Sequence, residues 1–388
     1  MIVKMKVIYL VLIFFLFQCF NVYADAKISN YQDYKITKKK FDLTEISAGF
    51  NYPWGMTFID DVNLLITEKK GKLFKFNVNS KLKEEVNHNL KIVAIGQGGL
   101  LDVLYHDDHV YFSYSHKIDK KFSSTAIAKG KLVNNSIKNL KVIFIANPKI
   151  KYSDIHYGSR LAIKDNYLFA SIGERGKGMI AQDPTKHPGS IIRINLDGSI
   201  PNDNPKFVDR PNWLPEIYQI GVRNPQGMTL SPFNNQIYIS NHGAMGGDFI
   251  GVISNSGNYG WKKVGWGGKN YSGTKIGDGE PFKEEFDQPL ISWVPSIAPS
   301  NIQFYDGEMF EEWKKNLLVT SLKFQMLIKL ELKNNKIENE EIILRSCKRH
   351  KKPCYQIGRI RDIEIDKSGS IYIITDESNS PLWKISKN

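Results

Sequence analysis

The side chains best suited to acid–base chemistry are a histidine and a glutamate at the two ends of one predicted hairpin. His156 stands in DIHYGSRLAI, just before a strand-like run, and Glu174 follows the next such run in SIGERG. A lone histidine in front of a strand is more often structural than functional. A carboxylate at the other end of the hairpin reverses that balance, because it fixes the tautomer of the imidazole and supports it as a general base. We therefore predict that His156 and Glu174 form a catalytic pair.

A second set of polar side chains, mostly cationic, stands at the start of strand-like runs. Its members are Gln97, His156, Arg160, Arg223, Asn224, Arg359 and Arg361. Arg359 and Arg361 alternate, so both should point to one face of a strand. If the set converges, its charge requires an anionic ligand, and several carboxylates would match the fork geometry of arginine.

Three further segments are open to more than one interpretation. Segment 223–227 (RNPQG) could be a rigid turn, with Pro and Gly setting the shape of the backbone. Lys323, in TSLKFQM, is equally consistent with a solvated lysine at the end of a strand. The glycine-rich segment 241–248 (NHGAMGGD) offers backbone carbonyls that could coordinate a hard cation, although such a segment is a weak signal by itself.

A sequence repeat predicts the elements that position these side chains. Six copies of one phrase, each with a hydrophobic alternation, a turn and a second strand-like run, begin at Trp54, Gly98, Gly158, Pro225, Pro299 and Arg359. Alternating runs rich in Val, Ile, Tyr and Phe predict an all-β protein, with one short helical candidate in FEEWKKN from Phe310. Each copy is long enough for a four-stranded sheet, so we predict a six-bladed β-propeller.

The propeller explains the positions of the polar residues. Residues just before each innermost strand should converge near the axis, although they are far apart in the sequence. The segment FDLTEISAGF from Phe41 could add a strand to the last blade and close the ring. A large sandwich or barrel is the competing architecture, and it would not explain the recurrence.

The N-terminus indicates export. Lys4 and Lys6 precede an apolar run from Val7, and segment 22–24 (VYA) offers a cleavage site, so residues 1–24 are a predicted signal peptide. The run is too short for a stable membrane span. Lipidation at Cys19 is an alternative. Residues 25–388 contain no linker-like segment and are predicted to form a single domain in the periplasm or outside the cell.

Charge and cysteine content agree with export. The formal net charge is +13, carried largely by scattered lysines, and no nucleic-acid-binding signature accompanies it. Solubility is therefore the favoured explanation of the charge, and no nucleic-acid partner is expected. Cys347 and Cys354, in RSCKRHKKPCYQ, are predicted to form a disulfide that closes a small basic loop, because His350 alone does not complete a zinc site.

Taken together, the motifs resemble those of the soluble, calcium-dependent pyrroloquinoline quinone (PQQ) sugar dehydrogenases, the glucose/sorbosone dehydrogenase group. The matching phrases follow the order of the family and span nearly the whole mature chain. They include GQGGLLDV at Gly96, HYGSRLAI at His156, SIGERG at Ser171, GVRNPQGM at Gly221, NHGAMGGD at Asn241 and RIRDIEI at Arg359.

The resemblance implies a propeller that binds PQQ over its axis and oxidises an aldose to its lactone by base-assisted hydride transfer. It assigns His156 as the base, Glu174 as its orienting carboxylate, and Arg223 as the group that polarises the quinone oxygen. Cofactor contacts fall to Gln97, Asn224, Lys323, Arg359 and Arg361. The carbonyls of Gly243 and Ala244 match the loop that binds the catalytic Ca²⁺. An external electron acceptor is also implied, and the protein is expected to be a monomer or a homodimer.

Several residues depart from the family pattern. Glu174 replaces a common Asp, Ser159 a frequent Gly, and Ala244 a frequent Pro, while segment 248–251 (DFIG) differs from the usual Asp-Glu-(Ile/Leu)-Asn. These changes bear on the affinity for ligands and on the choice of substrate more than on the reaction itself. Two other functions stay open, a calcium-dependent propeller lactonase and a binding propeller without catalysis. The sequence names neither the sugar nor the electron acceptor.

Overall fold

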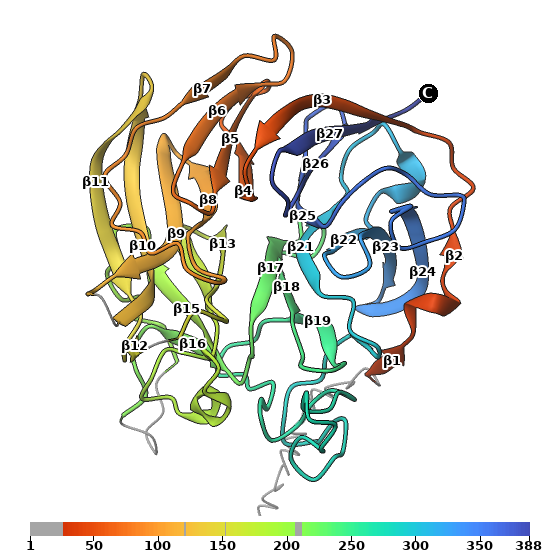
Figure 1. The fold of residues 1–388 in the computed structure, drawn as a ribbon. Helices are drawn as coiled ribbons and strands as arrows, with labels where there is room; N and C mark the ends of the chain where they lie inside the picture. The colour runs from red at the N-terminus through yellow and green to blue at the C-terminus, as the bar shows by residue number, and fades with distance from the viewer. Residues whose placement is uncertain (1–25, 120–121, 152, 206–211) are drawn as a thin grey trace, which may run out of the picture.

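The computed structural model describes residues 26–119, 122–151, 153–205 and 212–388. Six sheets of four or five strands surround a common axis (Figure 1). The six-bladed β-propeller predicted from the repeat is thus confirmed. The predicted signal peptide, residues 1–24, and Cys19 lie outside the described residues. Within the described ranges, no helix has the length and apolar character needed to cross a membrane.

Each blade begins with its innermost strand and continues outward along the chain. Blades 1 and 2 contain β4 (Pro53–Phe58), β5 (Asn63–Glu68), β6 (Leu73–Asn77) and β7 (Lys83–Glu85), then β8 (Leu100–His106), β9 (His109–Lys117), β10 (Phe122–Val133), β11 (Ser136–Ile145) and β12 (Ile150–Lys151). Blades 3 and 4 contain β13 (Gly158–Lys164), β14 (Tyr167–Ile172), β15 (Ser190–Asn195) and β16 (Ile217–Ile220), then β17 (Pro225–Leu230), β18 (Ile237–Asn241), β19 (Asp248–Val252) and β20 (Ile291–Trp293). Blades 5 and 6 contain β21 (Pro299–Phe304), β22 (Leu317–Ser321), β23 (Met326–Lys333) and β24 (Lys336–Arg345), then β25 (Ile360–Ile365), β26 (Ile371–Thr375) and β27 (Ser380–Ser386).

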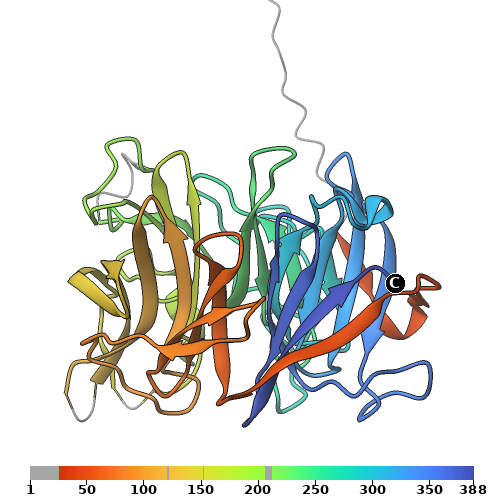
Figure 2. The same ribbon diagram turned by 90° about the horizontal axis from the view of Figure 1, so that it is seen from above.

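The N-terminal segment completes three of the blades. β3 (Asp42–Phe50) pairs antiparallel with β27, as Figure 1 shows at the top, so the predicted closing strand is confirmed. β1 (Lys27–Ser29) and β2 (Lys35–Ile36) add parallel edges to blades 4 and 5. The innermost strands contact one another in chain order, and the last, β25, contacts the first, β4. Seen from above, the strands of each blade run between the two faces of the ring (Figure 2).

Apolar side chains from adjacent blades form the core. Each of the six junctions between neighbouring blades holds its own buried cluster. In β14, Leu168 and Ala170 pack toward blade 2, whereas Phe169 packs toward blade 4. Alternate side chains thus serve opposite neighbours, which explains why the inner strands are apolar on both faces.

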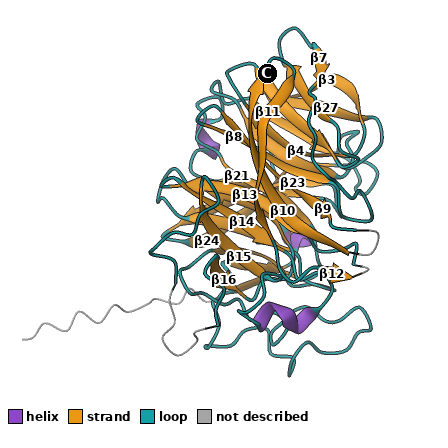
Figure 3. Cartoon of the chain, turned by 90° about the vertical axis from the view of Figure 1, so that its left-hand side faces the viewer, coloured by secondary structure: helices purple, strands orange, loops and turns teal. Residues whose placement is uncertain are grey.

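Helix is rare, as the colouring of Figure 3 shows. The described residues contain three short 3₁₀ segments: η1 (Tyr31–Asp33), η2 (Gly178–Gln182) and η3 (Glu311–Trp313). The helical candidate from Phe310 is therefore a single turn. The predicted disulfide between Cys347 and Cys354 is confirmed.

Candidate active site

The innermost strands all begin around a cavity of about 250 Å³ at one end of the propeller axis, called here the mouth cavity. Residues from all six blades line it. Four of the predicted site residues belong to this lining: Gln97, Asn224, Arg359 and Arg361. The structure therefore brings together residues that the repeat places at equivalent positions.

His156 and Glu174 meet at the edge of this lining. His156 precedes β13 and Glu174 follows β14, so the β13–β14 hairpin brings their side chains together, with 2.5 Å between His156 Nδ1 and Glu174 Oε1. Both residues are buried. The backbone N–H of His156 donates to Gln97 Oε1 (2.8 Å), which links the pair to the mouth cavity. The close approach requires Gly173, because a Cβ there would lie 2.2 Å from the His156 carbonyl oxygen.

The electrostatics of the pair favour a neutral histidine. Burial lowers the pKa of His156, the nearby charge of Arg223 lowers it further, and the hydrogen bond to Glu174 opposes both effects. Burial raises the pKa of Glu174, but the hydrogen bond to His156, the hydrogen bond from the Gly178 N–H and the charge of Arg223 together leave that pKa below its usual value. An ionised Glu174 can only accept, so Nδ1 carries the hydrogen and donates it. No described residue hydrogen-bonds the other ring nitrogen, Nε2, which is left as an acceptor.

Arg223 and Asn224 are held in the turn before β17. Both backbone N–H groups donate to Asn241 Oδ1, at 3.0 and 2.9 Å. The Arg223 guanidinium donates to the His242 carbonyl (3.4 Å) and lies 5.4 Å from the ring centre of Trp261. No carboxylate of the described ranges forms an ion pair with Arg223. Arg223 does not belong to the lining of the mouth cavity, and its charge has no described counter-ion.

Arg361 and Arg359 share one carboxylate, Asp376. Arg361 is buried, lies 2.8 Å from Asp376 Oδ2 and donates to Gln226 Oε1 (3.1 Å). Its Nε is buried without a partner among the described residues. Arg359 is more exposed and lies 3.6 Å from the same oxygen. The two arginines share a face, as predicted, and Asp376 balances part of the charge for which the sequence predicted an anionic ligand.

Arg160 departs from the prediction. It lies farther along the axis, in a second cavity of about 260 Å³, called here the channel cavity. Its Nη1 pairs with Asp102 Oδ1 (2.8 Å) and Asp362 Oδ1 (3.0 Å), and all three side chains are buried. Burial raises the pKa of both carboxyl groups, although Arg160 opposes the effect. Arg160 is thus paired with two carboxylates in the channel cavity, although its Nη2 is buried without a partner among the described residues.

Lys323 lies outside the lining of the mouth cavity. Its side chain is exposed, with Nζ 5.3 Å from the ring centre of Phe324. Its backbone N–H donates to the Ile297 carbonyl (3.2 Å), which fixes the chain beside the mouth. The structure thus places Lys323 with solvent around it rather than with the other predicted cofactor contacts.

The glycine-rich loop that contains Gly243 and Ala244 is braced by Asp248. Asp248 Oδ1 accepts from the Gly243 N–H (2.8 Å), and Oδ2 accepts from the Ala298 N–H (2.6 Å). Ser296 Oγ lies 3.3 Å from the Ala244 carbonyl oxygen. The Asp248 carboxylate is therefore already engaged, and the loop offers carbonyl oxygens as ligands.

Those carbonyls alone would be an incomplete set of ligands for Ca²⁺. Ca²⁺ takes six to eight oxygen ligands, and the part of the chain that the structure describes holds no group of three acidic, His or Cys side chains arranged for a metal. A Ca²⁺ ion at Gly243 and Ala244 would need further oxygens from a bound cofactor or from water. The residues fit such a shared site and do not fit a site made of protein ligands alone.

The other departures have local structural effects. Ser159 adopts a φ of +82°, a conformation that favours glycine. In segment 248–251, Phe249 packs against Trp266 with 4.7 Å between ring centres. Gly251 makes room for Tyr259, because a Cβ there would lie 2.1 Å from the Tyr259 hydroxyl. The unusual DFIG segment is thus accommodated within the blade.

Sequence reasoning missed the carboxylates and one lysine. Asp376 directly follows β26, and Glu174 is the second residue after β14, so the repeat contained the signal in the first two residues after each second strand. Lys69, which follows β5, lines the mouth cavity for the same reason. Asp102 and Asp362 lie inside innermost strands, where an apolar alternation conceals them.

The sequence model of the glucose/sorbosone dehydrogenase family matches residues 50–384. The chain belongs to this family. It is 32% identical to the aldose sugar dehydrogenase YliI of Escherichia coli over 87% of this chain and 90% of that protein. It is 27% identical to quinoprotein glucose dehydrogenase B of Acinetobacter calcoaceticus over 93% and 90% of the two chains.

A solved structure agrees with the family assignment. The soluble aldose sugar dehydrogenase of Escherichia coli, in its apo form, has a TM-score of 0.81 and 30% identity. The alignment covers 90% of this chain and 100% of that one. The chain is therefore a sugar dehydrogenase family member with a matching fold over most of its length.

Proposed function

We propose that this protein is a PQQ-dependent aldose dehydrogenase that oxidises an aldose to its lactone and passes the electrons to an external acceptor. The observation that carries the proposal is the buried His156–Glu174 pair, 2.5 Å apart, beside a cavity lined by Arg359 and Arg361. A neutral histidine next to an ionised carboxylate suits a general base. The name of the Acinetobacter relative, a quinoprotein, supports the choice of cofactor.

The mouth cavity has the donors that a planar polycarboxylate requires. Arg361 has a buried Nε without a partner among the described residues, and Arg223 forms no ion pair with a described carboxylate. Gln97, Asn224 and Arg359 add further polar groups to the same region. We assign these five residues to hold PQQ, with Lys323 as a contact from the rim. When bound, PQQ supplies a quinone carbonyl that accepts the hydride from the anomeric carbon of the sugar.

The protein's own residues remove the proton and orient the catalytic base. His156 Nε2, the free acceptor, removes the proton from the anomeric hydroxyl. Glu174 holds the imidazole through Nδ1–H and stabilises the imidazolium that forms. Arg223 places positive charge near the site where negative charge develops, which is the usual use of a buried cation in catalysis. The carbonyls of Gly243 and Ala244 would hold Ca²⁺ together with oxygens of the cofactor.

The cellular location of the protein is part of the same proposal. A cleaved signal peptide at residues 1–24 would deliver residues 25–388 to the periplasm or the exterior as a single catalytic domain. A disulfide between Cys347 and Cys354 is consistent with an oxidising compartment.

Reconstitution tests the proposal. Purified protein is titrated with PQQ and Ca²⁺, binding is followed by absorbance and thermal shift, and dye reduction is then measured with a panel of aldoses. We expect a thermal shift that requires PQQ, and dye reduction with at least one aldose. Absence of PQQ binding would overturn the proposal. Hydrolysis of lactones that depends on metal without quinone would instead support the lactonase.

A further inference from the structure

The disulfide closes a strongly basic loop that the proposed chemistry does not use. The disulfide loop, residues 345–355, connects β24 of blade 5 to the chain that leads into β25 of blade 6. Four of its cations are exposed to solvent: Lys348, Arg349, Lys351 and Lys352. One ion pair with a described residue involves this group, Lys348 with Glu377 at 3.1 Å. The other three cations have no carboxylate partner in the described ranges.

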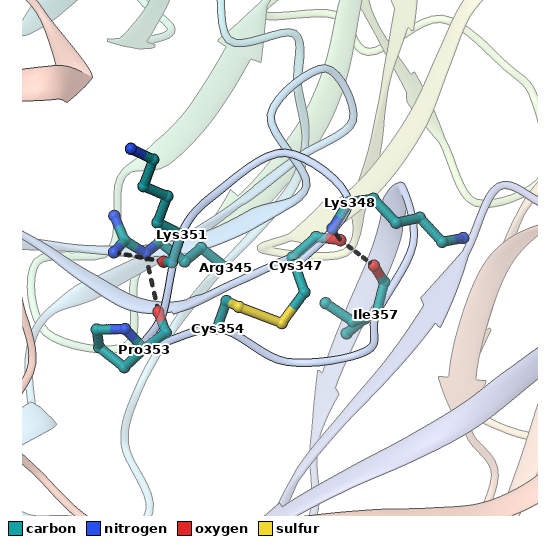
Figure 4. Close-up of a disulfide and its surroundings, with 8 residues drawn as sticks. Arg345, Cys347, Lys348, Lys351, Pro353, Cys354 and Ile357 are labelled. Atoms are coloured by element: carbon teal, nitrogen blue, oxygen red, sulfur yellow. Dashed lines mark hydrogen bonds between the residues drawn. A yellow bond between two sulfur atoms is a disulfide. The ribbon is translucent and has the colours of Figure 1, made fainter.

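The loop is held in one conformation by covalent and polar contacts. Cys347 and Cys354 form the disulfide, and the Arg345 side chain donates to the carbonyls of Pro353 and Lys351, each at 3.0 Å (Figure 4). Ser346 Oγ donates to the Ile357 carbonyl (2.5 Å). Because these contacts brace the backbone of the loop, less backbone entropy is lost when a partner binds.

The loop lies at the same end of the propeller as the mouth cavity. His350 Nε2 donates to the carbonyl of Phe324, the neighbour of Lys323. Glu377, the partner of Lys348, directly follows Asp376 of the cavity lining. The disulfide loop therefore bridges blades 5 and 6 beside the opening. None of its four exposed cations belongs to the lining of the cavity.

We propose that the disulfide loop is the docking surface for an acidic electron-carrier protein that collects electrons from the site. This inference rests on the proposed function. Oxidation of one aldose to a lactone releases two electrons and two protons, so two one-electron carriers are reduced for each sugar, and the protons leave to solvent. The carrier must approach the mouth, and there it meets a rigid surface with unpaired positive charge.

The arrangement of the charges favours a protein over an anionic substrate. A small anion in the mouth cavity would contact Arg359 and Arg361, not the tips of the loop. Figure 4 shows the Lys348 and Lys351 side chains extending away from each other on opposite sides of the loop. Charges spread in this way match a broad acidic surface, and such complementarity speeds encounter and fixes orientation.

The test measures binding of two carrier probes to protein loaded with PQQ and Ca²⁺ and to protein without them. The probes are an acidic c-type cytochrome and a basic c-type cytochrome of similar size. The triple variant Arg349→Glu, Lys351→Glu and Lys352→Glu reverses the charge of the loop. The matched control is Lys131→Glu, Lys138→Glu and Lys336→Glu, three exposed lysines near the hairpins at the other end of the ring. Both triples change the net charge equally.

We expect the loop triple to weaken binding of the acidic cytochrome about tenfold or more at low salt and to flatten its salt dependence. Dye-linked turnover should be unchanged, and the control triple should bind like the wild type. Equal losses in both triples, or no loss in the loop triple, would overturn the proposal. Loop-dependent binding to anionic lipid vesicles without binding to the acidic cytochrome would also overturn it, in favour of a membrane surface.

The test separates this inference from the proposed function. If no aldose supports dye reduction, the dehydrogenase proposal fails, while the binding measurements still decide whether the loop is a docking surface. If dye reduction is normal and the acidic cytochrome binds the loop triple variant as it binds the wild type, only the docking proposal fails.

Discussion

The two cavities on the propeller axis differ in how their charges are balanced. In the channel cavity, Arg160 Nη1 meets two carboxylates at 2.8 and 3.0 Å, so two anions face one cation, and the Arg160 Nη2 has no partner among the described residues. At the mouth, Arg361 and Arg359 share the single carboxylate of Asp376, and the Arg361 Nε lacks a partner among the described residues. Each buried arginine keeps one donor without a described partner, so the difference lies in the charge. Two carboxylates balance one cation in the channel cavity, whereas one carboxylate serves two cations at the mouth, which leaves positive charge available to a ligand there. Arg160 is the third residue of β13 and Arg361 the second residue of β25, and the two side chains line different cavities.

The largest expected effect concerns the base at the mouth. His156→Ala should lower kcat by about 10²–10⁴-fold, because proton removal by a positioned base contributes that much, while PQQ affinity should change little. Steady-state dye assays and a PQQ titration measure the two quantities. His187 is the matched control, a buried histidine 3.3 Å from Glu216 that does not belong to the lining of the mouth cavity. His187→Gln should keep its turnover, and a similar loss there would show that the effect is structural.

Removing Arg160, the cation of the channel cavity, should mainly affect the stability of the folded protein. Arg160→Met would leave Asp102 and Asp362 buried together without a counter-charge, which costs about 3–5 kcal/mol in comparable pairs. Chemical denaturation followed by tryptophan fluorescence measures this loss. Unchanged unfolding would mean that the ion pairs are weaker than the distances indicate.

Removing Arg361, the buried arginine of the mouth cavity, should mainly affect cofactor binding. Arg361→Met is expected to weaken PQQ binding by about 10–100-fold, the loss of one or two charge-assisted hydrogen bonds. Its cost in stability should be smaller than that of Arg160→Met, because Asp376 keeps Arg359 at 3.6 Å. Calorimetric titration and denaturation of both variants give the comparison. Equal stability losses with unchanged PQQ affinity would remove the distinction between the cavities.

The smallest expected effect concerns the carboxylate behind the base. Glu174→Gln should reduce kcat by roughly tenfold, since it weakens orientation and leaves the base in place. The hydrogen bond to Glu174 raises the pKa of His156 against burial. Removing it should lower that pKa further, so the acidic limb of the kcat/KM profile moves to lower pH. A limb that stays in place, or moves to higher pH, would contradict the assigned pair.

Much of this organisation could be predicted from local sequence. The six repeat starts locate the innermost strands, and the run from Phe41 closes the ring, because hydrophobic alternation and turn spacing are local properties. The His156–Glu174 contact was predictable for the same reason, since one hairpin joins the two residues. The cysteine pair followed from proximity in the chain.

Charge balance could not be predicted in the same way. Asp102 of blade 2 and Asp362 of blade 6 meet Arg160 of blade 3 only because the ring closes around the axis. Which partner a buried charge finds depends on residues hundreds of positions away. The exposed position of Lys323 likewise depends on the path of the chain between blades, which the hydrophobic periodicity of the strands does not predict.

The most direct test of the account is a single turnover without any electron acceptor. The protein is loaded with PQQ and Ca²⁺, an aldose is added, and the absorbance of the bound cofactor is followed by stopped flow for the wild type and His156→Ala. We predict that the wild-type cofactor is reduced in proportion to the added aldose and that the variant binds the cofactor but reduces it at least about 10²-fold more slowly. Equal rates of reduction in the two proteins, or a wild type that binds PQQ and is never reduced by an aldose, would contradict the account.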